Sequence, residues 1–372
     1  MYTDDFSLYI HIPFCSSFCD YCDFYSVSAK DYSGCYDKFL QALADDIKYQ
    51  INYFEVKNII TAYIGGGTPS VLGKKIGFLL DELKKLPQFT PLEFTIEANP
   101  ESLTEEFLSV CKEGGINRLS LGVQTFFEPS RAAVNRGLNF KGIEEKLKIA
   151  SDYFLGSFSA DLIIGLPFQN EKTVTEDIKK LLDFNPVHVS LYSLTIEEET
   201  PLYENIKTKN VNLPCSETAD SLWLLARNIL SASGLNHYEV SNFAKTGSEC
   251  LHNIRYWRMQ NWLGAGPAAS GTIINEKKST AGRFTYKNDL SAYIKSPCVK
   301  NAVYEDLDKN MLMRESLLMG FRRKEGPDAE IFKRRFGLTA EECIPKTLSK
   351  WKDKEKMLFL NQFLLDAFSE LI

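Results

Sequence analysis

Six short apolar runs in the first half of the chain, each followed by an amphipathic segment, constrain the fold most. Most of these runs are nearly continuous in apolar residues, which is typical of parallel strands covered on both faces. They cover residues 7–12, 60–64, 92–97, 118–122, 158–164 and 187–194. Helical periodicity marks residues 37–52, 74–86, 104–113, 142–152 and 173–184 between them. Because parallel strands need right-handed helical crossovers, the pattern predicts an α/β fold, a partial (β/α)6 barrel of the TIM type.

The pattern changes beyond about residue 197. A predicted helix over 216–232 precedes a stretch rich in glycine and aromatic residues, 237–271, and the chain from about 284 onward reads as mostly helical. The expected domains are therefore the barrel (1–205), a connecting region (206–283) and a small, mostly helical C-terminal accessory domain (284–372).

Composition narrows the class of protein. The 372 residues are 44% hydrophobic and 25% charged, and the net charge of −6 gives no electrostatic reason to expect a nucleic-acid partner. The first residues lack the basic and apolar segments of a signal peptide, and no apolar run reaches the roughly 18–20 residues that span a bilayer. We therefore expect a cytoplasmic location. Oligomeric state (monomer or dimer) and peripheral membrane contact stay open.

The cysteines are unevenly distributed. Three of the nine, Cys15, Cys19 and Cys22, fall within eight residues after the first predicted strand, and the other six are scattered singly. An odd number with this distribution argues against a disulfide framework and favours a metal site plus ordinary thiols.

The Cys-x3-Cys-x2-Cys spacing predicts a [4Fe–4S] cluster. Three thiolates on a short loop can bind three irons of a cubane, which leaves one iron without a protein ligand. That iron can chelate the amino and carboxylate groups of S-adenosylmethionine (SAM). The alternative is a structural zinc site, which normally needs four protein ligands. His11 could be the fourth ligand, but its position on a predicted strand favours a supporting or core role.

This spacing resembles the signature of the radical SAM superfamily. Further motifs resemble those of its oxygen-independent coproporphyrinogen III oxidase group, and more closely the heme-chaperone branch of that group. The resemblance runs from Tyr9 into the C-terminal region, through the motifs Gly65–Pro69, Glu97–Pro100, Leu121–Thr125, Asp161–Ile163 and His252–Trp257.

The resemblance implies a SAM pocket whose residue types suit the parts of the cofactor. An aromatic ring suits the adenine, glycines let the backbone approach the methionine moiety, a carboxylate suits a ribose hydroxyl or the ammonium, and an arginine suits the carboxylate. Simple packing of the tyrosine and a tight turn at the glycines are the alternatives. The implied residues are Tyr9, Tyr21, Gly66, Gly67, Thr68, Glu97, Gln124, Arg136 and Asp161.

The resemblance also implies heme as a ligand. His252 would be an axial ligand of the heme iron, with Tyr256 and Trp257 packing on the macrocycle. From spacing alone, a core histidine beside structural aromatics explains this motif as well. The sequence suggests no role for His188 or His237.

Two departures from the coproporphyrinogen enzymes decide between functions. Phe24 stands where those enzymes have a fourth cysteine, and only fourteen residues precede Cys15, whereas they have a longer lead-in. Both departures favour a heme chaperone that transfers heme to an acceptor hemoprotein, for which a respiratory hemoprotein is the candidate, and no catalytic residue is assigned. The alternative is an oxygen-independent coproporphyrinogen III dehydrogenase, which carries out oxidative decarboxylation to protoporphyrinogen IX. Radical SAM methyl or alkyl transfer is a third hypothesis.

Overall fold

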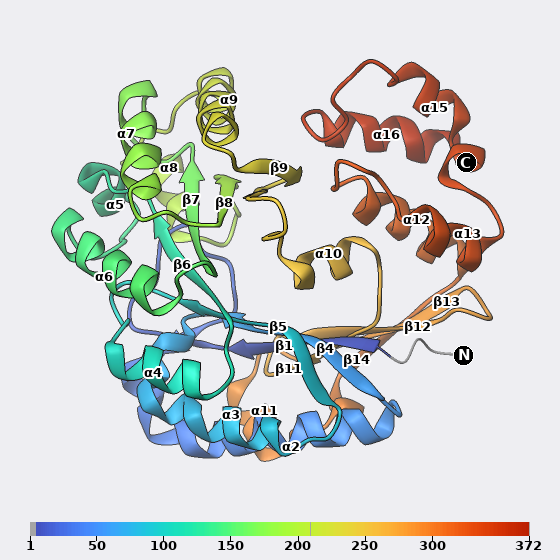
Figure 1. Cartoon of the computed structure of the whole chain (residues 1–372), viewed down its shortest axis with the longest axis horizontal. Coiled ribbons are helices and arrows are strands. Elements are labelled where there is room, and N and C mark those ends of the chain that lie inside the picture. Colours follow the sequence, from blue (N-terminus) through green and yellow to red (C-terminus); the bar gives the residue numbers. More distant parts are fainter. Residues whose placement is uncertain (1–4, 209, 372) are drawn as a thin grey trace.

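One continuous, curved sheet organises the molecule. The computed structural model describes residues 5–208 and 210–371, and twelve of its strands form a sheet in the order β14-β13-β12-β11-β1-β4-β5-β6-β7-β8-β10-β9 (Figure 1). The strands from β11 to β8 in this order are parallel. Their bounds are β1 Asp5–Ile12, β4 Asn58–Gly66, β5 Phe89–Ala98, β6 Arg118–Gln124, β7 Phe158–Ile164, β8 His188–Ser193 and β11 Trp262–Ala265.

The predicted strands and helices of the barrel are confirmed. All six predicted strands are present and lie side by side in sequence order, as right-handed crossovers require. The intervening helices cover the outer face of the sheet (Figure 1). They are α2 (Tyr36–Tyr53), α3 (Ile76–Lys84), α4 (Glu105–Glu113), α6 (Phe140–Tyr153) and α7 (Glu171–Leu182), followed by α9 (Ser216–Ala232).

Local signals explain where these helices start. The Thr104 hydroxyl accepts a hydrogen bond from the backbone N–H of Phe107 at the start of α4. Asn170 and Thr173 form a reciprocal capping box at the start of α7.

The barrel is partial because its edge strands do not meet. β9 (Asn236–Glu239) and β14 (Val303–Leu307) form the two ends of the sheet. The antiparallel strand β10 (Asn242–Ala244) extends one side, and β12 (Ser270–Asn275), β13 (Thr280–Thr285) and β14 extend the other. The sequence did not predict these strands, because they are short and interrupted by polar residues and glycine.

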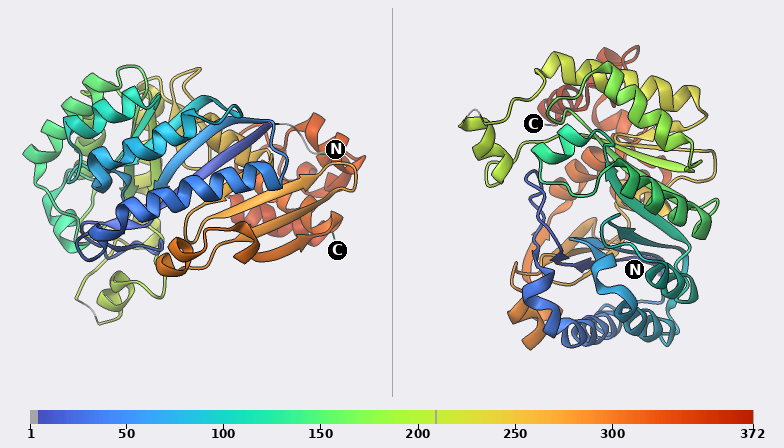
Figure 2. Two further views of the ribbon diagram at one scale, coloured as in Figure 1. Left: turned by 90° about the horizontal axis from the view of Figure 1, so that it is seen from below. Right: turned by 90° about the vertical axis from the view of Figure 1, so that its left-hand side faces the viewer.

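The hydrophobic core has two main parts. One fills the space between the sheet and the outer helices and includes Phe284, Tyr293 and Val299, with α11 (Leu290–Lys295) beside α2 (Figure 2). The other lies between the strands β11 to β14, which contribute Trp262, Ile274, Ala281 and Leu307, and the last helices: α12 (Lys309–Gly320), α13 (Ala329–Phe336), α14 (Ala340–Cys343), α15 (Pro345–Lys350) and α16 (Leu360–Glu370). The predicted boundary of the C-terminal domain, residue 284, falls within β13. The division into three domains stays a prediction.

No helix in the described part of the chain combines the length and the apolar character that crossing a bilayer requires.

The concave side of the parallel strands is polar along its whole depth. Alternate residues of a strand share one face, and here they exchange hydrogen bonds between neighbouring strands. Thr61 on β4 donates to Ser7 on β1 at 2.8 Å, and further up the barrel Tyr63 on β4 donates to Glu97 on β5 at 2.7 Å. Helix α10 (Leu251–Trp257) lies inside this concave face (Figure 1). The barrel interior is therefore built to hold polar groups as well as apolar side chains.

Candidate functional site

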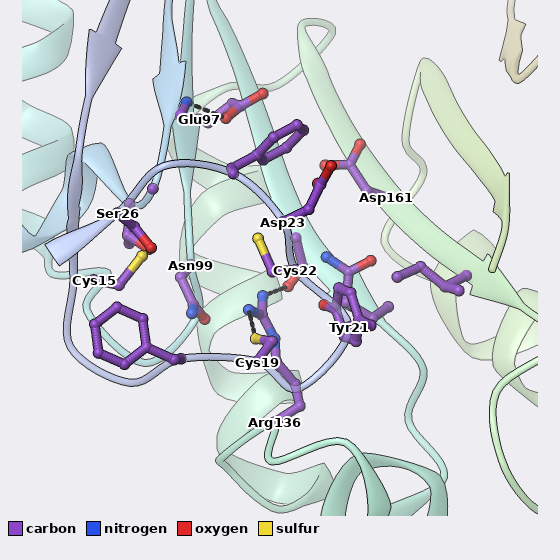
Figure 3. A pocket seen from close by; sticks show the side chains of 18 of the residues that line it. Cys15, Cys19, Tyr21, Cys22, Asp23, Ser26, Glu97, Asn99, Arg136 and Asp161 are labelled. Carbon is purple, nitrogen blue, oxygen red and sulfur yellow. Dashed lines mark hydrogen bonds between the residues drawn. The ribbon is translucent and has the colours of Figure 1, made fainter. Parts of the chain in front are cut away.

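A cavity of about 470 Å³ opens at the C-terminal ends of the parallel strands. This is the edge at which barrels of this type bind ligands, because the βα loops converge there. The cavity gathers the three clustered cysteines and most of the residues that the sequence assigned to SAM (Figure 3). Those residues are Cys15, Cys19, Tyr21, Cys22, Gly66, Gly67, Thr68, Glu97, Gln124, Arg136 and Asp161.

The three thiols reach the cavity from one loop. Cys15 ends the two-residue strand β2 (Phe14–Cys15), which pairs with β3 (Val27–Ser28) and returns the loop to the barrel edge. Burial raises the pKa of the Cys15 thiol, and it raises that of the Cys22 thiol to about 11. These thiols are therefore protonated at neutral pH, and binding of a metal centre would displace their protons.

The donor set of the cavity bears on what it can hold. In the described residues, no group of three His, Cys, Asp or Glu side chains lies close enough together to hold one metal ion. Three cysteine side chains from one short loop line this cavity, and cysteine thiolates are the ligands that hold iron–sulfur clusters. The residues present therefore fit a [4Fe–4S] cluster.

Two glycines at the end of β4, Gly66 and Gly67, bring the backbone close to the cysteine loop. Gly66 has φ +111°, and a Cβ there would lie 2.6 Å from His11 Nδ1. A Cβ on Gly67 would lie 2.9 Å from Cys15 Sγ, and the Gly67 N–H donates to the Ile12 carbonyl at 2.8 Å. No larger residue fits this turn without displacing Cys15 or His11, so the glycines are required by the close approach of the two loops.

Two carboxyl groups line the deep side of the cavity. Burial raises the pKa of the Glu97 carboxyl to about 7, against hydrogen bonds from the Tyr63 hydroxyl and the Gly66 N–H, and the nearby Asp161 raises it further. Burial likewise raises the pKa of Asp161 to about 6, opposed by hydrogen bonds from Ser190 and Ser120. A cation or a hydroxyl group of a bound ligand beside Glu97 and Asp161 would stabilise their ionised carboxylates, which burial disfavours.

Two further side chains carry polar atoms that lack a protein partner. Gln124 Oε1 and Arg136 Nε are buried and have no hydrogen-bond partner among the described residues. Gln124 adopts φ +71°, a left-handed conformation unusual for a residue other than glycine. Unpaired buried polar atoms are costly, and strained residues cluster at ligand sites, so both observations fit a polar ligand such as SAM.

Tyr9 is the one SAM residue of the prediction that does not line the cavity. Its hydroxyl hydrogen-bonds His11 Nδ1 at 3.1 Å, while His11 Nε2 bonds the Tyr25 carbonyl at 2.9 Å. Both ring nitrogens of His11 therefore form hydrogen bonds, and the ring packs against Gly66. His11 thus has the supporting role that its position on the first predicted strand indicated.

The predicted heme motif lies elsewhere, inside the barrel. His252 is only 1% exposed, its Nδ1 hydrogen-bonds the Thr61 hydroxyl at 3.0 Å, and its ring packs between Tyr63 and Tyr256. Burial lowers its pKa to about 3, and the nearby Arg255 lowers it further, so the ring is neutral. His252 Nε2 is buried and has no partner among the described residues.

The rest of the motif also makes contacts in the protein interior. Tyr256 packs on Trp262, and the Arg322 guanidinium lies over the Trp257 ring. The motif residues do not line this cavity. The structure thus brings together the residues that the sequence assigned to the cluster and to SAM, and it places the predicted heme motif outside the cavity.

The sequence analysis missed several cavity residues. Asn99 lies just past the end of β5; Tyr192 is the penultimate residue of β8, and Thr195 and Glu197 lie just past that strand. Their position at or just past strand ends was the available signal. Phe24 lines the cavity as well and is 64% exposed, at the position that distinguishes the chain from the coproporphyrinogen enzymes.

Comparison with known proteins agrees with this geometry. Residues 9–181 match the family model of the radical SAM superfamily. The chain is 33% identical to the heme chaperone HemW of Lactococcus lactis, over 92% of this chain and 88% of that protein. It is 31% identical to the heme chaperone HemW of Bacillus subtilis, over 94% and 91%, and 36% identical to that of Escherichia coli, over 72% and 70%.

Among solved structures, the coproporphyrinogen III oxidase HemN of Escherichia coli, described as a radical SAM enzyme, has a similar fold. The TM-score is 0.81 at 22% identity, and the match covers 98% of this chain and 90% of that chain. At this level of identity the likeness establishes the shared fold.

Proposed function

The chain belongs to the HemW family of the radical SAM superfamily, and from this membership we propose that it is a heme chaperone with a SAM-liganded [4Fe–4S] cluster. The observation that supports this proposal most is the sequence similarity to heme chaperones along nearly the whole chain, with 33% identity over 92% of its length. In this proposal the chain binds heme and passes it to an acceptor hemoprotein, for which a respiratory hemoprotein is the candidate.

Cys15, Cys19 and Cys22 are the proposed cluster ligands. When bound, the cluster and SAM supply one-electron chemistry at the sulfonium centre. The chain's own residues would hold SAM: Gly66 and Gly67 offer backbone groups to the methionine moiety, and Glu97 and Arg136 offer opposite charges. Tyr21, which packs with Val134 and Leu202, offers a ring for the adenine.

The heme site is the less constrained part of the proposal. One ring nitrogen of His252, Nε2, has no hydrogen-bond partner in the part of the chain that the structure describes, and iron binds a neutral imidazole nitrogen of this kind. His252 belongs to α10, and its side chain is buried against Thr61 and Tyr63 of β4, so heme could reach it only if α10 moves away from the sheet. Iron coordination by His252 therefore predicts that heme binding changes the environment of α10.

The alternative is turnover as a coproporphyrinogen III dehydrogenase, which the well-formed SAM cavity and its carboxylates would also suit. Phe24 in place of a fourth cysteine favours the chaperone.

An anaerobic assay separates the two functions. The reconstituted protein is mixed with heme in one experiment, and with coproporphyrinogen III, SAM and a reductant in another. Heme bound in stoichiometric amount, with transfer to an apo-hemoprotein and without protoporphyrinogen IX, is the expected result. Catalytic formation of protoporphyrinogen IX would refute the proposal in favour of the dehydrogenase.

Two variants test the sites. Cys19→Ala should remove the visible absorption of the cluster, whereas Cys215→Ser, at an exposed cysteine outside the cavity, should retain it. His252→Ala should alter the Soret band of bound heme and weaken binding. An unchanged heme spectrum would reject His252 as the ligand but leave the cluster assignment intact.

A further inference from the structure

Three successive residues after α5 (Glu128–Ala133) contact three successive residues of the cysteine loop. The Val134 carbonyl accepts a hydrogen bond from the Asp20 N–H at 3.1 Å. Asn135 Nδ2 donates to the Phe18 carbonyl at 2.8 Å, and Arg136 Nη1 donates to Cys19 Sγ at 3.2 Å (Figure 3). We refer to residues 134–136 as the loop clamp.

Hydrogen bonds from Arg131 hold the loop clamp in place. This side chain is only 1% exposed, and its guanidinium donates to the carbonyls of Val123, Thr125, Gly137 and Leu138. The Arg131 carbonyl accepts the N–H groups of Val134 and Arg136. A buried arginine with this many carbonyl partners holds the turn in one conformation, so the loop clamp is a preformed element.

Conformation and packing add to this rigidity. Asn135 has φ +53°, a left-handed conformation that asparagine tolerates better than most residues. Val134 is buried and packs with Leu202 and Tyr21. On the other side, the Leu202 N–H in α8 (Pro201–Lys207) donates to the Asp20 carbonyl at 2.8 Å, so both backbone groups of Asp20 are held.

The geometry points to the loop clamp as a positioning device for the cluster, an inference that rests on the proposed cluster at Cys15, Cys19 and Cys22. Asn135 would hold the loop in the ligating conformation, so that less chain entropy is lost when the cluster is loaded. Arg136 would in addition donate a charge-assisted hydrogen bond to the Cys19 sulfur. A cationic donor at a ligating sulfur favours the more negative, reduced cluster and raises its reduction potential.

Asn135→Gly tests the positioning by Asn135. Glycine adopts the left-handed conformation without strain, so the substitution removes the bond to Phe18 and little else from the folded state. Asn185 gives a matched control, because it is also an exposed asparagine with φ +53°, and its side chain accepts a hydrogen bond from Lys245 at the surface, away from the cysteine loop. We expect cluster release to an iron chelator to be several-fold faster in Asn135→Gly and unchanged in Asn185→Gly, with similar melting temperatures for the two variants.

Arg136→Met tests the electrostatic part. In the absence of SAM, the ratio of reduced to oxidised cluster at a fixed potential should fall about tenfold, a shift of ~59 mV to more negative potential for a one-electron couple. Arg136→Lys, which keeps the positive charge, should recover part of this shift, and Asn135→Gly should leave the potential unchanged. A redox titration followed by electron paramagnetic resonance measures all three, and a purely structural role would not produce this order.

The outcomes separate the inference from the proposed function. A wild-type protein that takes up no cluster would contradict both. A wild-type cluster together with an unaltered release rate in Asn135→Gly, or an unaltered potential in Arg136→Met, would overturn the corresponding role of the loop clamp and leave the proposed function standing.

Discussion

At the scale of single residues, burial determines the protonation of the barrel interior. His252 shows this most directly, because it lies between Tyr63 and Tyr256 and burial lowers its pKa to about 3. The unfolded chain binds a proton at this ring near pH 6.5, whereas the folded chain does not bind it until about pH 3. The contribution of His252 to stability is therefore present above pH 6.5 and is lost as the pH falls below that value.

His252→Asn should remove this dependence. Asparagine can keep a hydrogen bond to Thr61 but does not titrate. Between pH 7 and pH 5 we expect the free energy of unfolding of the wild type to fall by about 1–2 kcal/mol more than that of the variant. Urea unfolding of the cluster-free protein at the two pH values measures the difference. Parallel losses in both proteins would contradict the buried, neutral state of His252.

At the scale of elements, one carboxylate holds helix α10 inside the barrel. Glu93 on β5 accepts the Leu251 N–H at 2.9 Å and the His252 N–H at 2.8 Å, so it satisfies two donors at the N-terminus of α10. Arg118 on the next strand lies 3.7 Å away and balances the charge. The position of the predicted heme motif therefore depends on a residue far from it in sequence.

Glu93→Gln should loosen α10. It leaves the buried Arg118 without its counter-charge and weakens the cap, and we expect a loss of about 2–4 kcal/mol in the free energy of unfolding. Glu106→Gln, at an exposed ion pair with Lys74, is the matched control and should change it by less than about 0.5 kcal/mol. Denaturant unfolding of both variants gives the comparison, and equal stabilities would show that Glu93 does not anchor α10.

At the scale of the whole molecule, the two parts of the core should open separately. Phe363 on α16 is fully buried and packs on Phe321 and Trp351, within the core that the last helices form against the strands β11 to β14. Elements with separate cores tend to unfold as separate units. Damage to this part of the core should therefore spare the cavity that Cys15, Cys19 and Cys22 line.

Phe363→Ala should cost about 3–5 kcal/mol within the C-terminal helices, because it leaves a cavity in their core. Amide hydrogen exchange should accelerate in α12–α16 and stay unchanged in β4–β7. Leu365→Ala, in the same helix but 69% exposed, should leave both regions unchanged. Faster exchange throughout the barrel would show a single cooperative unit.

Prediction of the fold from sequence succeeded where the signal is local. The strand from Phe158 to Ile164 and the helix from Ser216 to Ala232 were predicted with the bounds that the structure has. The strand β11 was missed because its four residues carry no periodicity of their own. It joins the parallel part of the sheet through pairing with β1, at the opposite end of the barrel sequence, and pairs with β12 on its other side.

The candidate site divides in the same way. Cys15, Cys19 and Cys22 are neighbours in sequence, Gly66, Gly67 and Glu97 follow or end predicted strands, and Asp161 lies within one, so the sequence alone indicated the cavity that they line. The loop clamp, the cap of α10 by Glu93 and the burial of His252 depend on side chains from distant segments. Only the tertiary structure decides such contacts, because packing selects which polar groups meet in the interior, whereas spacing along the chain decides which residues can share one loop or one sheet edge.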